Sequence, residues 1–245
     1  MLPRIELKRY CLQYIVVTVR ELQSLLGKLH FVSSCVRPGR IFVSRLLIWI
    51  RSLPDDKEYY NIPLFAKKGP DMAVKIFEYF EWSVYDCPLM NGLILGGCGG
   101  WFLDRREYFH VLFPSHVLNQ NININQLELL VVMICVTLWN THLFKKQILI
   151  KCDNQSVVMV LNSGSTRDLF MQTCLREILF FAAKFHFEIR AIHFPGVENR
   201  VADLLSRWHM NCSYKEEFFN LPNISVSSCN EKFVYSGLFQ FIHDW

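Results

Sequence analysis

The chain has 245 residues, a formal net charge of +4 and 51% hydrophobic residues. This length can hold one large domain or two small ones, and the hydrophobic fraction can bury a core, which excludes an intrinsically disordered protein. The most apolar windows are shorter than a bilayer span, and the N-terminus lacks the features of a signal peptide. We therefore expect an intracellular protein, cytoplasmic or nuclear, with no membrane partner.

The positive charge is concentrated at the N-terminal end. Residues 1–51 contain nine lysines and arginines but only two glutamates. A basic segment before a near-neutral remainder is typical of a protein that binds a polyanion such as nucleic acid, although helices with solvated basic faces give the same pattern. The nine cysteines are scattered singly, without a C-x-x-C pair. This predicts reduced, mostly buried thiols.

The first predicted elements form a helical hairpin. Thr18 and Glu21 have the spacing of a capping box, and apolar residues follow at helical intervals, which predicts a helix over residues 19–35. A second amphipathic helix is predicted over residues 40–53. The residues that follow, 54–81, are polar and rich in turn-forming residues, and we interpret them as a linker.

Strand and helix patterns alternate in the second half of the chain. A strand pair is followed by helices and further strands, which is typical of a mixed sheet covered by helices. The fold class predicted is therefore α/β. In chain order the predicted elements are strands at 98–102 and 107–113, a helix at 125–142, a strand at 147–152, helices at 155–161 and 165–185, a strand at 188–194, and a helix at 199–208.

Three acidic residues lie where acids are costly. Glu128 is in the first turn of a helix that is apolar nearly all round, Asp153 ends a buried strand, and Asp203 lies in the last predicted helix. Two-metal hydrolysis of a phosphodiester needs such a carboxylate cluster, and oxygen ligands favour Mg²⁺ or Mn²⁺. Structural roles remain open: Glu128 can close a capping box with Asn125, Asp153 can form a turn, and Asp203 can face solvent.

A family resemblance rests on four segments of sequence. INQLELL at 124–130, KCDNQSVV at 151–158, STRD at 165–168 and HFPGVENRVADLLSRW at 193–208 resemble the RNase H domain of retroelement polymerases. The N-terminal helices, over residues 20–47, are similar to those that follow the reverse-transcriptase palm in DIRS-like elements. The chain thus resembles the C-terminal part of a DIRS-like reverse transcriptase and RNase H polyprotein.

The resemblance implies roles for individual residues. Glu128, Asp153 and Asp203 fall on the second, third and fourth acids of the RNase H metal site. His193 falls on the histidine of a mobile loop that assists proton transfer or product release. The expected cofactor is Mg²⁺ or Mn²⁺, without a small-molecule cofactor. The expected partners are an RNA/DNA hybrid and other parts of a retroelement polyprotein.

The chain departs from the family at the start of the domain. Family members carry their first acid on a strand that shortly precedes a glycine-rich strand, which matches residues 97–102 here. Residues 82–92 resemble the segment that precedes the family's domain, so we expect that the first strand is missing together with its acid. Asp86 is the candidate substitute at the metal site. Asp55-Asp56 lacks the aromatic residue of the polymerase motif, so no polymerase activity is expected.

These observations predict a small helical remnant, similar to a polymerase thumb or connection, at 1–53 and a linker at 54–81. An RNase H-like domain is predicted at 82–208, with a C-terminal extension at 209–245. Two functions remain open. One is an RNase H-type endonuclease for RNA/DNA hybrids, weakened or inactivated by loss of the first acid, and the other is a non-catalytic remnant that binds nucleic acid. Another RNase H-like nuclease, such as an integrase or exonuclease, fits the HxPGxxNxxAD ending less well.

Overall fold

The contacts within the chain define two compact units, Met1–Glu81 with His243–Trp245, and Trp82–Ile242. Each has its own hydrophobic core. The structure is a computed structural model, and it describes residues 16–35, 39–54, 59–63, 86–94, 96–196, 198–222 and 224–242.

The N-terminal unit is a helical hairpin with a small sheet. Helices α2 (Val19–Cys35) and α3 (Gly39–Arg51) pack on each other, and β1 (Val16–Thr18) pairs antiparallel with β2 (Tyr59–Asn61). The two helices are those predicted. The interpretation of residues 54–81 as a linker misses β2, because three residues are too few to display an alternating pattern.

The predicted capping box of α2 is confirmed. The Thr18 backbone N–H donates to the Glu21 carboxylate over 2.8 Å, and the Glu21 N–H donates to the Thr18 hydroxyl oxygen over 3.3 Å. These bonds satisfy two N–H groups that a helix start leaves without partners. The core of the unit is formed by apolar residues from β1 and both helices: Val17, Leu22, Leu25, Leu26, Leu29, Val43 and Leu46.

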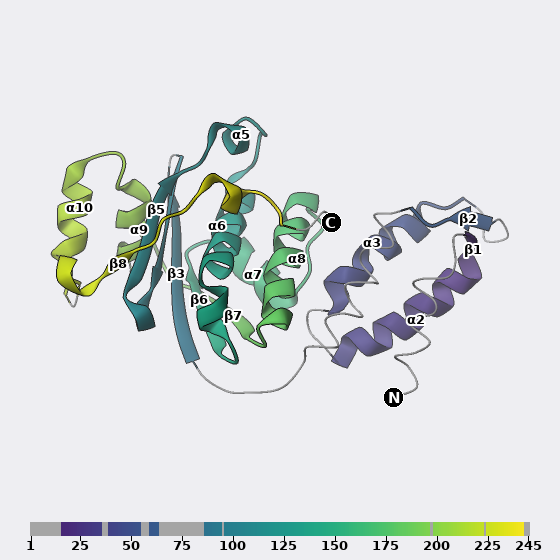
Figure 1. The fold of residues 1–245 in the computed structure, drawn as a ribbon. Helices are drawn as coiled ribbons and strands as arrows, with labels where there is room; N and C mark the ends of the chain where they lie inside the picture. The colour runs from purple at the N-terminus through teal and green to yellow at the C-terminus, as the bar shows by residue number, and fades with distance from the viewer. Residues whose placement is uncertain are drawn as a thin grey trace. The chain divides into compact units, whose positions relative to one another are not determined.

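The second unit is built on a six-stranded mixed sheet (Figure 1). The strand order is β7-β6-β3-β4-β5-β8; β3, β4 and β5 are antiparallel neighbours, β6 and β7 run parallel to β3, and β8 runs parallel to β5. This sheet with its helices confirms the predicted fold class and is consistent with an RNase H-like fold. The strands are β3 (Asp86–Ile94), β4 (Gly97–Phe102), β5 (Glu107–Leu112), β6 (Gln147–Cys152), β7 (Glu188–His193) and β8 (Asn230–Glu231).

The expectation that the first strand is missing is wrong. Strand β3 lies directly before the glycine-rich β4, pairs with it from Leu89↔Phe102 to Ile94↔Gly97, and pairs in parallel with β6 on its other edge. The sequence argues against a strand here, because Pro88 has no N–H to donate to a neighbouring strand and Asn91-Gly92 is a typical turn dipeptide. The sheet therefore has no gap at this position.

Helices cover both faces of the sheet, α6, α7 and α8 on one side and α9 and α10 on the other (Figure 1). Helix α6 with η2, Ile124–Leu143, is apolar and long enough to span a membrane by length and composition, but more than half of it is buried inside this unit, as in a core helix. The helical elements are α5 (Ser115–Leu118), α6 (Ile124–Trp139), α7 (Gln155–Ser163), α8 (Leu169–Lys184), α9 (Arg200–Arg207), α10 (Cys212–Phe219), and the 3-10 turns η1 (Leu103–Arg105), η2 (Asn140–Leu143), η3 (Val226–Ser228) and η4 (Ser236–Phe239).

The glycines of β4 allow close approach of helices from both sides. A Cβ on Gly99 would lie 2.4 Å from the Cβ of Leu205 in α9, and a Cβ on Gly100 would lie 2.9 Å from the sulfur of Cys135 in α6. Real Cβ atoms do not approach so closely, so these positions require glycine. The glycine-rich strand thus fixes α9, which carries Asp203, tightly against the sheet.

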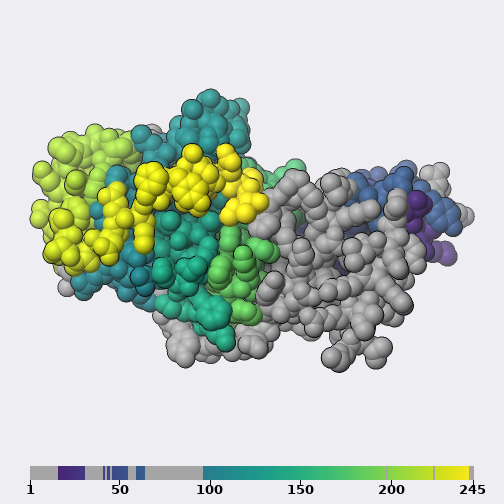
Figure 2. Space-filling view, in the orientation of Figure 1, coloured from purple at the N-terminus to yellow at the C-terminus, as the bar shows by residue number. Residues whose placement is uncertain are grey.

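The residues after the last predicted helix belong to the same unit. Phe218 of α10 packs with Trp101 and Tyr108 of the sheet in one buried cluster. Further along, Leu238 and Phe239 are also buried. Figure 2 shows the C-terminal residues, in yellow, lying across the teal part of the unit.

Candidate active site

The strand β6 delivers Asp153 to the C-terminal edge of the sheet. Asp153 directly follows β6, and the next residue, Asn154, caps α7: its side-chain oxygen accepts from the backbone N–H groups of Ser156 (3.0 Å) and Val157 (3.2 Å). Asn154 therefore makes the cap, and Asp153 is left for another role. A carboxylate at this position lies where α/β sheets bind their ligands.

Helix α6 carries Glu128 into the interior. The capping box of α6 is formed by Asn123 and Gln126, with bonds of 2.8 and 3.1 Å between the two residues. The alternative interpretation, in which Glu128 closes a box with Asn125, is therefore wrong. Glu128 is only 4% exposed. A buried carboxylate is costly unless other groups compensate for its lost hydration, so this position needs a reason beyond capping.

Glu128 and Asp153 meet, and Cys152 joins them. Their ligand atoms all lie within 4.8 Å of one another. Cys152 is fully buried, and Asp153 is exposed. Two carboxylates and one thiol, from the C-terminal end of β6 and the first turns of α6, form a group that could hold a divalent cation.

The surroundings of Asp153 disfavour its negative charge. Although Asp153 as a residue is exposed, its carboxylate is partly shielded from water by neighbouring groups, which raises the pKa of Asp153, and the negative charge of Asp203 raises it further. A hydrogen bond from the backbone N–H of Asp153 and the nearby His193 oppose these effects, but the pKa remains above its ordinary value. A cation bound at this carboxylate would reverse the balance, because an opposite charge favours the ionised form.

His193 reaches the same edge of the sheet. It ends β7, opposite Cys152, and its Nε2 lies 3.1 Å from the backbone carbonyl oxygen of Asp153. The turn that follows also borders the site, since a Cβ on Gly196 would lie 3.4 Å from Asp153 Oδ2. Gly196 of the motif thus lies beside the carboxylate.

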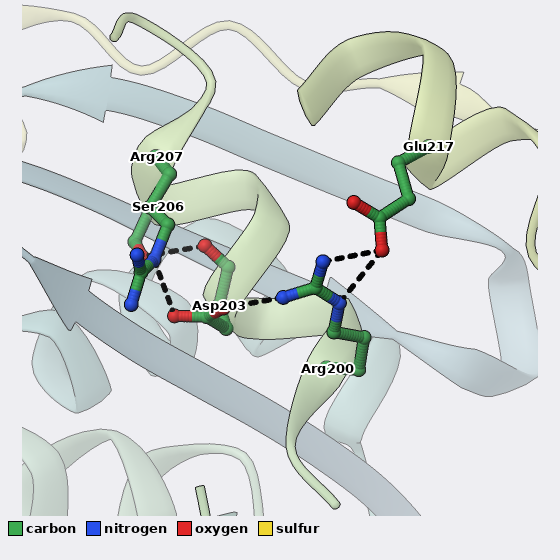
Figure 3. Close-up of polar contacts among 5 residues, drawn as sticks. All are labelled: Arg200, Asp203, Ser206, Arg207 and Glu217. Atoms are coloured by element: carbon green, nitrogen blue, oxygen red, sulfur yellow. Dashed lines mark hydrogen bonds and ion pairs between the residues drawn. The ribbon is translucent and has the colours of Figure 1, made fainter. Parts of the chain in front are cut away.

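Asp203 occupies a network of its own (Figure 3). Its Oδ2 accepts from Arg200 Nη1 at 3.1 Å and its Oδ1 from Arg207 Nε at 2.8 Å. Arg200 also forms an ion pair with Glu217 of α10, its Nε lying 2.9 Å from Glu217 Oε1. Asp203 therefore does not simply face solvent. It is close enough to Asp153 to affect its pKa but lies outside the three-donor group.

The structure does not bring Asp86 to this site. Asp86 pairs with Gln147 at the start of β6, six residues before Asp153. At roughly 3.3 Å per strand residue, its backbone lies about 20 Å from the level of Asp153. The same register continued places Asn91 level with Cys152 and Gly92 level with Asp153. Strand β3 thus has no acidic residue at the level of the site.

Two features of the site were missed by the sequence analysis. Cys152 was taken as a small buried hydrophobe, although its place beside Asp153 at a strand end could have pointed to the site. Arg200 and Arg207 stand three residues before and four residues after Asp203, which is the spacing of ion pairs on a helix. That spacing could have predicted the network of Figure 3.

The donors present fit one metal ion better than two. Two Mg²⁺ ions about 3.5–4 Å apart need several anionic ligands between them. In the described part of the chain, both oxygens of Asp203 accept from guanidinium groups and no other group of His, Cys, Asp or Glu side chains meets the distances for a metal site. Glu128 and Asp153 can together bind one ion.

The fold and the site together define an α/β domain with carboxylates at the C-terminal edge of a mixed sheet. Residues 91–209 match the family described as reverse transcriptase-like. This match supports a retroelement-type RNase H-like domain in this part of the chain. No curated protein matches the chain.

Proposed function

We propose that the chain derives from the C-terminal part of a DIRS-like reverse transcriptase and RNase H polyprotein, and that its α/β unit acts on RNA/DNA hybrids inside the cell. The observation that carries this proposal is the meeting of Glu128 and Asp153 within a domain that matches the reverse transcriptase-like family. The N-terminal helices would be a thumb-like or connection-like remnant, with other parts of the polyprotein as partners.

The reaction for which this type of site is built is hydrolysis of the RNA strand. Bound Mg²⁺ or Mn²⁺ would supply an activated water at neutral pH and charge stabilisation at the leaving oxygen. Glu128 and Asp153 would hold the ion, and His193, beside the Asp153 carbonyl, is placed to move a proton at its imidazole. Contacts to 2′-hydroxyls and phosphates would orient the hybrid, with Arg20, Lys28 and Arg51 as exposed cations of the N-terminal unit.

A second candidate is a non-catalytic domain that retains the affinity for nucleic acid. It is favoured by the pairing of Asp203 with two arginines and by Asn91 and Gly92 at the strand level where an acid would complete the site. With one ion in place of two, turnover falls by orders of magnitude. The two candidates share a fold and a partner, and they differ in whether the RNA strand is cut.

Cleavage and binding of a labelled RNA/DNA hybrid by the full chain decide between the candidates. Wild type is compared with Glu128→Gln and Asp153→Asn in Mg²⁺ and in Mn²⁺, with Asp104→Asn as a control in the turn η1. Slow cleavage by wild type and the control, lost in both site variants, identifies a ribonuclease. Binding that falls with salt and no cleavage above the Asp153→Asn background identifies the binding remnant. A chain that neither binds nor cleaves the hybrid overturns the proposal.

A further inference from the structure

We propose that Cys152 is a third metal ligand, so that the site selects a thiophilic divalent ion such as Zn²⁺ or Cd²⁺ over Mg²⁺. The proposal rests on the proposed function only in taking Glu128 and Asp153 as metal ligands. It adds a sulfur donor that an all-oxygen magnesium site does not contain.

The geometry brings three donors of two chemical kinds together. The sulfur of Cys152 and one carboxylate oxygen each from Glu128 and Asp153 lie within 4.8 Å of one another. Ligands of a tetrahedral zinc ion, with bonds of 2.0–2.3 Å, are about 3.5 Å apart, so the three donors must move closer together to bind one ion. Cys152 stands on β6 and Glu128 on α6, which packs on the neighbouring strand β3.

The sulfur of Cys152 is held against the start of α7. Cys152 Sγ accepts from the backbone N–H of Asn154 at 3.4 Å, and Asn154 is the N-cap of α7. The Asn154 side chain also donates to Asn125 Oδ1 over 2.8 Å, which holds the cap against the first turn of α6.

The ligand set decides which ion is preferred. Mg²⁺ requires hard oxygen ligands in octahedral geometry, whereas thiolates select softer ions. A carboxylate–carboxylate–thiolate set leaves a fourth position open, as in sites that keep one place for water or substrate. Binding would release the thiol proton to the solvent. Excess Mg²⁺ should therefore compete poorly with Zn²⁺ or Cd²⁺.

A titration of the reduced full chain with Cd²⁺ tests whether Cys152 is a ligand. The signal is the ultraviolet absorption of a cadmium–thiolate bond. The variants are Cys152→Ser and the control Cys135→Ser, which removes a buried thiol of α6 outside the three-donor group. Wild type and the control should give a band that saturates near one equivalent and survives excess Mg²⁺. The band should disappear in Cys152→Ser, with affinity at least about tenfold lower, since even outer-shell changes cost that much.

The outcomes separate this inference from the proposed function. A band that persists in Cys152→Ser, or a wild type that binds Mn²⁺ but gives no band, overturns the sulfur ligand and leaves the carboxylate site standing. A wild type that binds neither ion overturns the metal site itself. If Cys152→Ser does not fold by circular dichroism, ¹¹³Cd NMR of the wild type decides, because its chemical shift separates sulfur-bound from all-oxygen cadmium.

Discussion

Asp153 carries an electrostatic cost in the metal-free fold. Burial and the charge of Asp203 raise its pKa above the ordinary value of 3.8. A carboxyl group that binds its proton more tightly when folded supports the fold at low pH. That support is lost as pH rises from 3.8 through the raised folded value. The cost is therefore fully present at neutral pH.

Replacing Asp153 should make the metal-free protein more stable at pH 7. In EDTA, Asp153→Asn is expected to raise the free energy of unfolding relative to wild type, and the difference should vanish below pH 3.8, where both residues are neutral. Urea unfolding at a series of pH values measures it. Asp104→Asn, which loses only an exposed pair with Lys146 at 3.8 Å, should show no gain. An Asp153→Asn protein less stable than wild type at pH 7 would show that the charged carboxylate does not destabilise the metal-free fold.

Asp203 should behave as a structural acid. Asp203→Asn loses the charge on two arginine hydrogen bonds and is expected to cost about 1 kcal/mol of unfolding free energy, since both arginines are partly exposed. Its Cd²⁺ or Mn²⁺ affinity should stay near that of wild type, whereas Asp153→Asn should abolish binding. Calorimetric titration of the two variants makes the comparison. Loss of metal binding in Asp203→Asn would show that Asp203 leaves its arginines to bind the ion.

At the scale of elements, the close packing of α9 on β4 depends on the absence of a side chain at Gly99. Gly99→Ala places a Cβ 2.4 Å from the Leu205 Cβ and 2.9 Å from its backbone carbon, so helix and strand must separate. Overpacking of this kind costs about 1–3 kcal/mol. The control is Gly27→Ala in α2, where nothing lies within 4 Å and a gain of about 0.5–1 kcal/mol is expected. Urea unfolding followed by tryptophan fluorescence tests both, and an unchanged Gly99→Ala would contradict the close packing.

A side-chain hydrogen bond links the elements that carry Glu128 and Asp153. Asn125, one turn before Glu128, accepts from the Asn154 amide, which follows Asp153. Asn125→Ala is expected to weaken metal binding about tenfold, because outer-shell groups orient the ligands. Asn125→Asp keeps the accepting oxygen and should bind at least as well as wild type. Equal affinities for all three proteins, measured by Cd²⁺ titration, would show that the bond does not position the ligands.

Local signals with a physical mechanism predicted the elements around the site. The apolar run before Asp153 predicted β6 to the residue, and the helix predicted at 155–161 matches α7 (Gln155–Ser163) except at its end. Strand β3 was missed because Pro88 and Asn91-Gly92 are turn signals, and its neighbours β4 and β6 override them. Tertiary pairing of this kind leaves no periodic trace in the sequence.

The site was also predictable only in part. Glu128 and Asp153 were singled out as costly acids, and the fold brings them together. The arginine partners of Asp203 could not be deduced from the sequence, because helical spacing permits an ion pair without requiring one. The position of Asp86 also depends on strand register, which a single residue cannot reveal.

At the scale of the molecule, the domain extends past the family match. The match ends at residue 209, but the residues that follow bury part of the sheet. Glu107, on β5, is 3% exposed and accepts from Trp139 Nε1 at 3.0 Å, Arg105 Nε at 3.0 Å and Lys232 Nζ at 3.3 Å. Burial alone would raise the pKa of Glu107, but the hydrogen bonds and charges of Arg105 and Lys232 lower it. The C-terminal segment thus supplies one of the two cations that keep this buried carboxylate charged.

Truncation after His209 should therefore prevent stable folding of the α/β unit. It removes Phe218 from the cluster of Trp101 and Tyr108, worth about 1.5–3 kcal/mol for the buried ring alone, and it removes Lys232 from Glu107. Together these losses approach the whole stability of a typical domain, which is about 5–15 kcal/mol. The truncated chain is expected to aggregate or lose its cooperative thermal transition, while a chain ending at Ile242 should keep it.

A point variant separates the two contributions of the C-terminal segment. Lys232→Met keeps most of the side-chain length but removes the charge, and we expect a loss of about 1–3 kcal/mol with the fold retained. Because the stability that depends on a charged Glu107 is lost as pH falls towards its lowered folded pKa, the deficit of Lys232→Met should shrink at acidic pH. Thermal unfolding from neutral to acidic pH measures this. A chain ending at His209 that unfolds like wild type would show that the domain does not need the residues after 209.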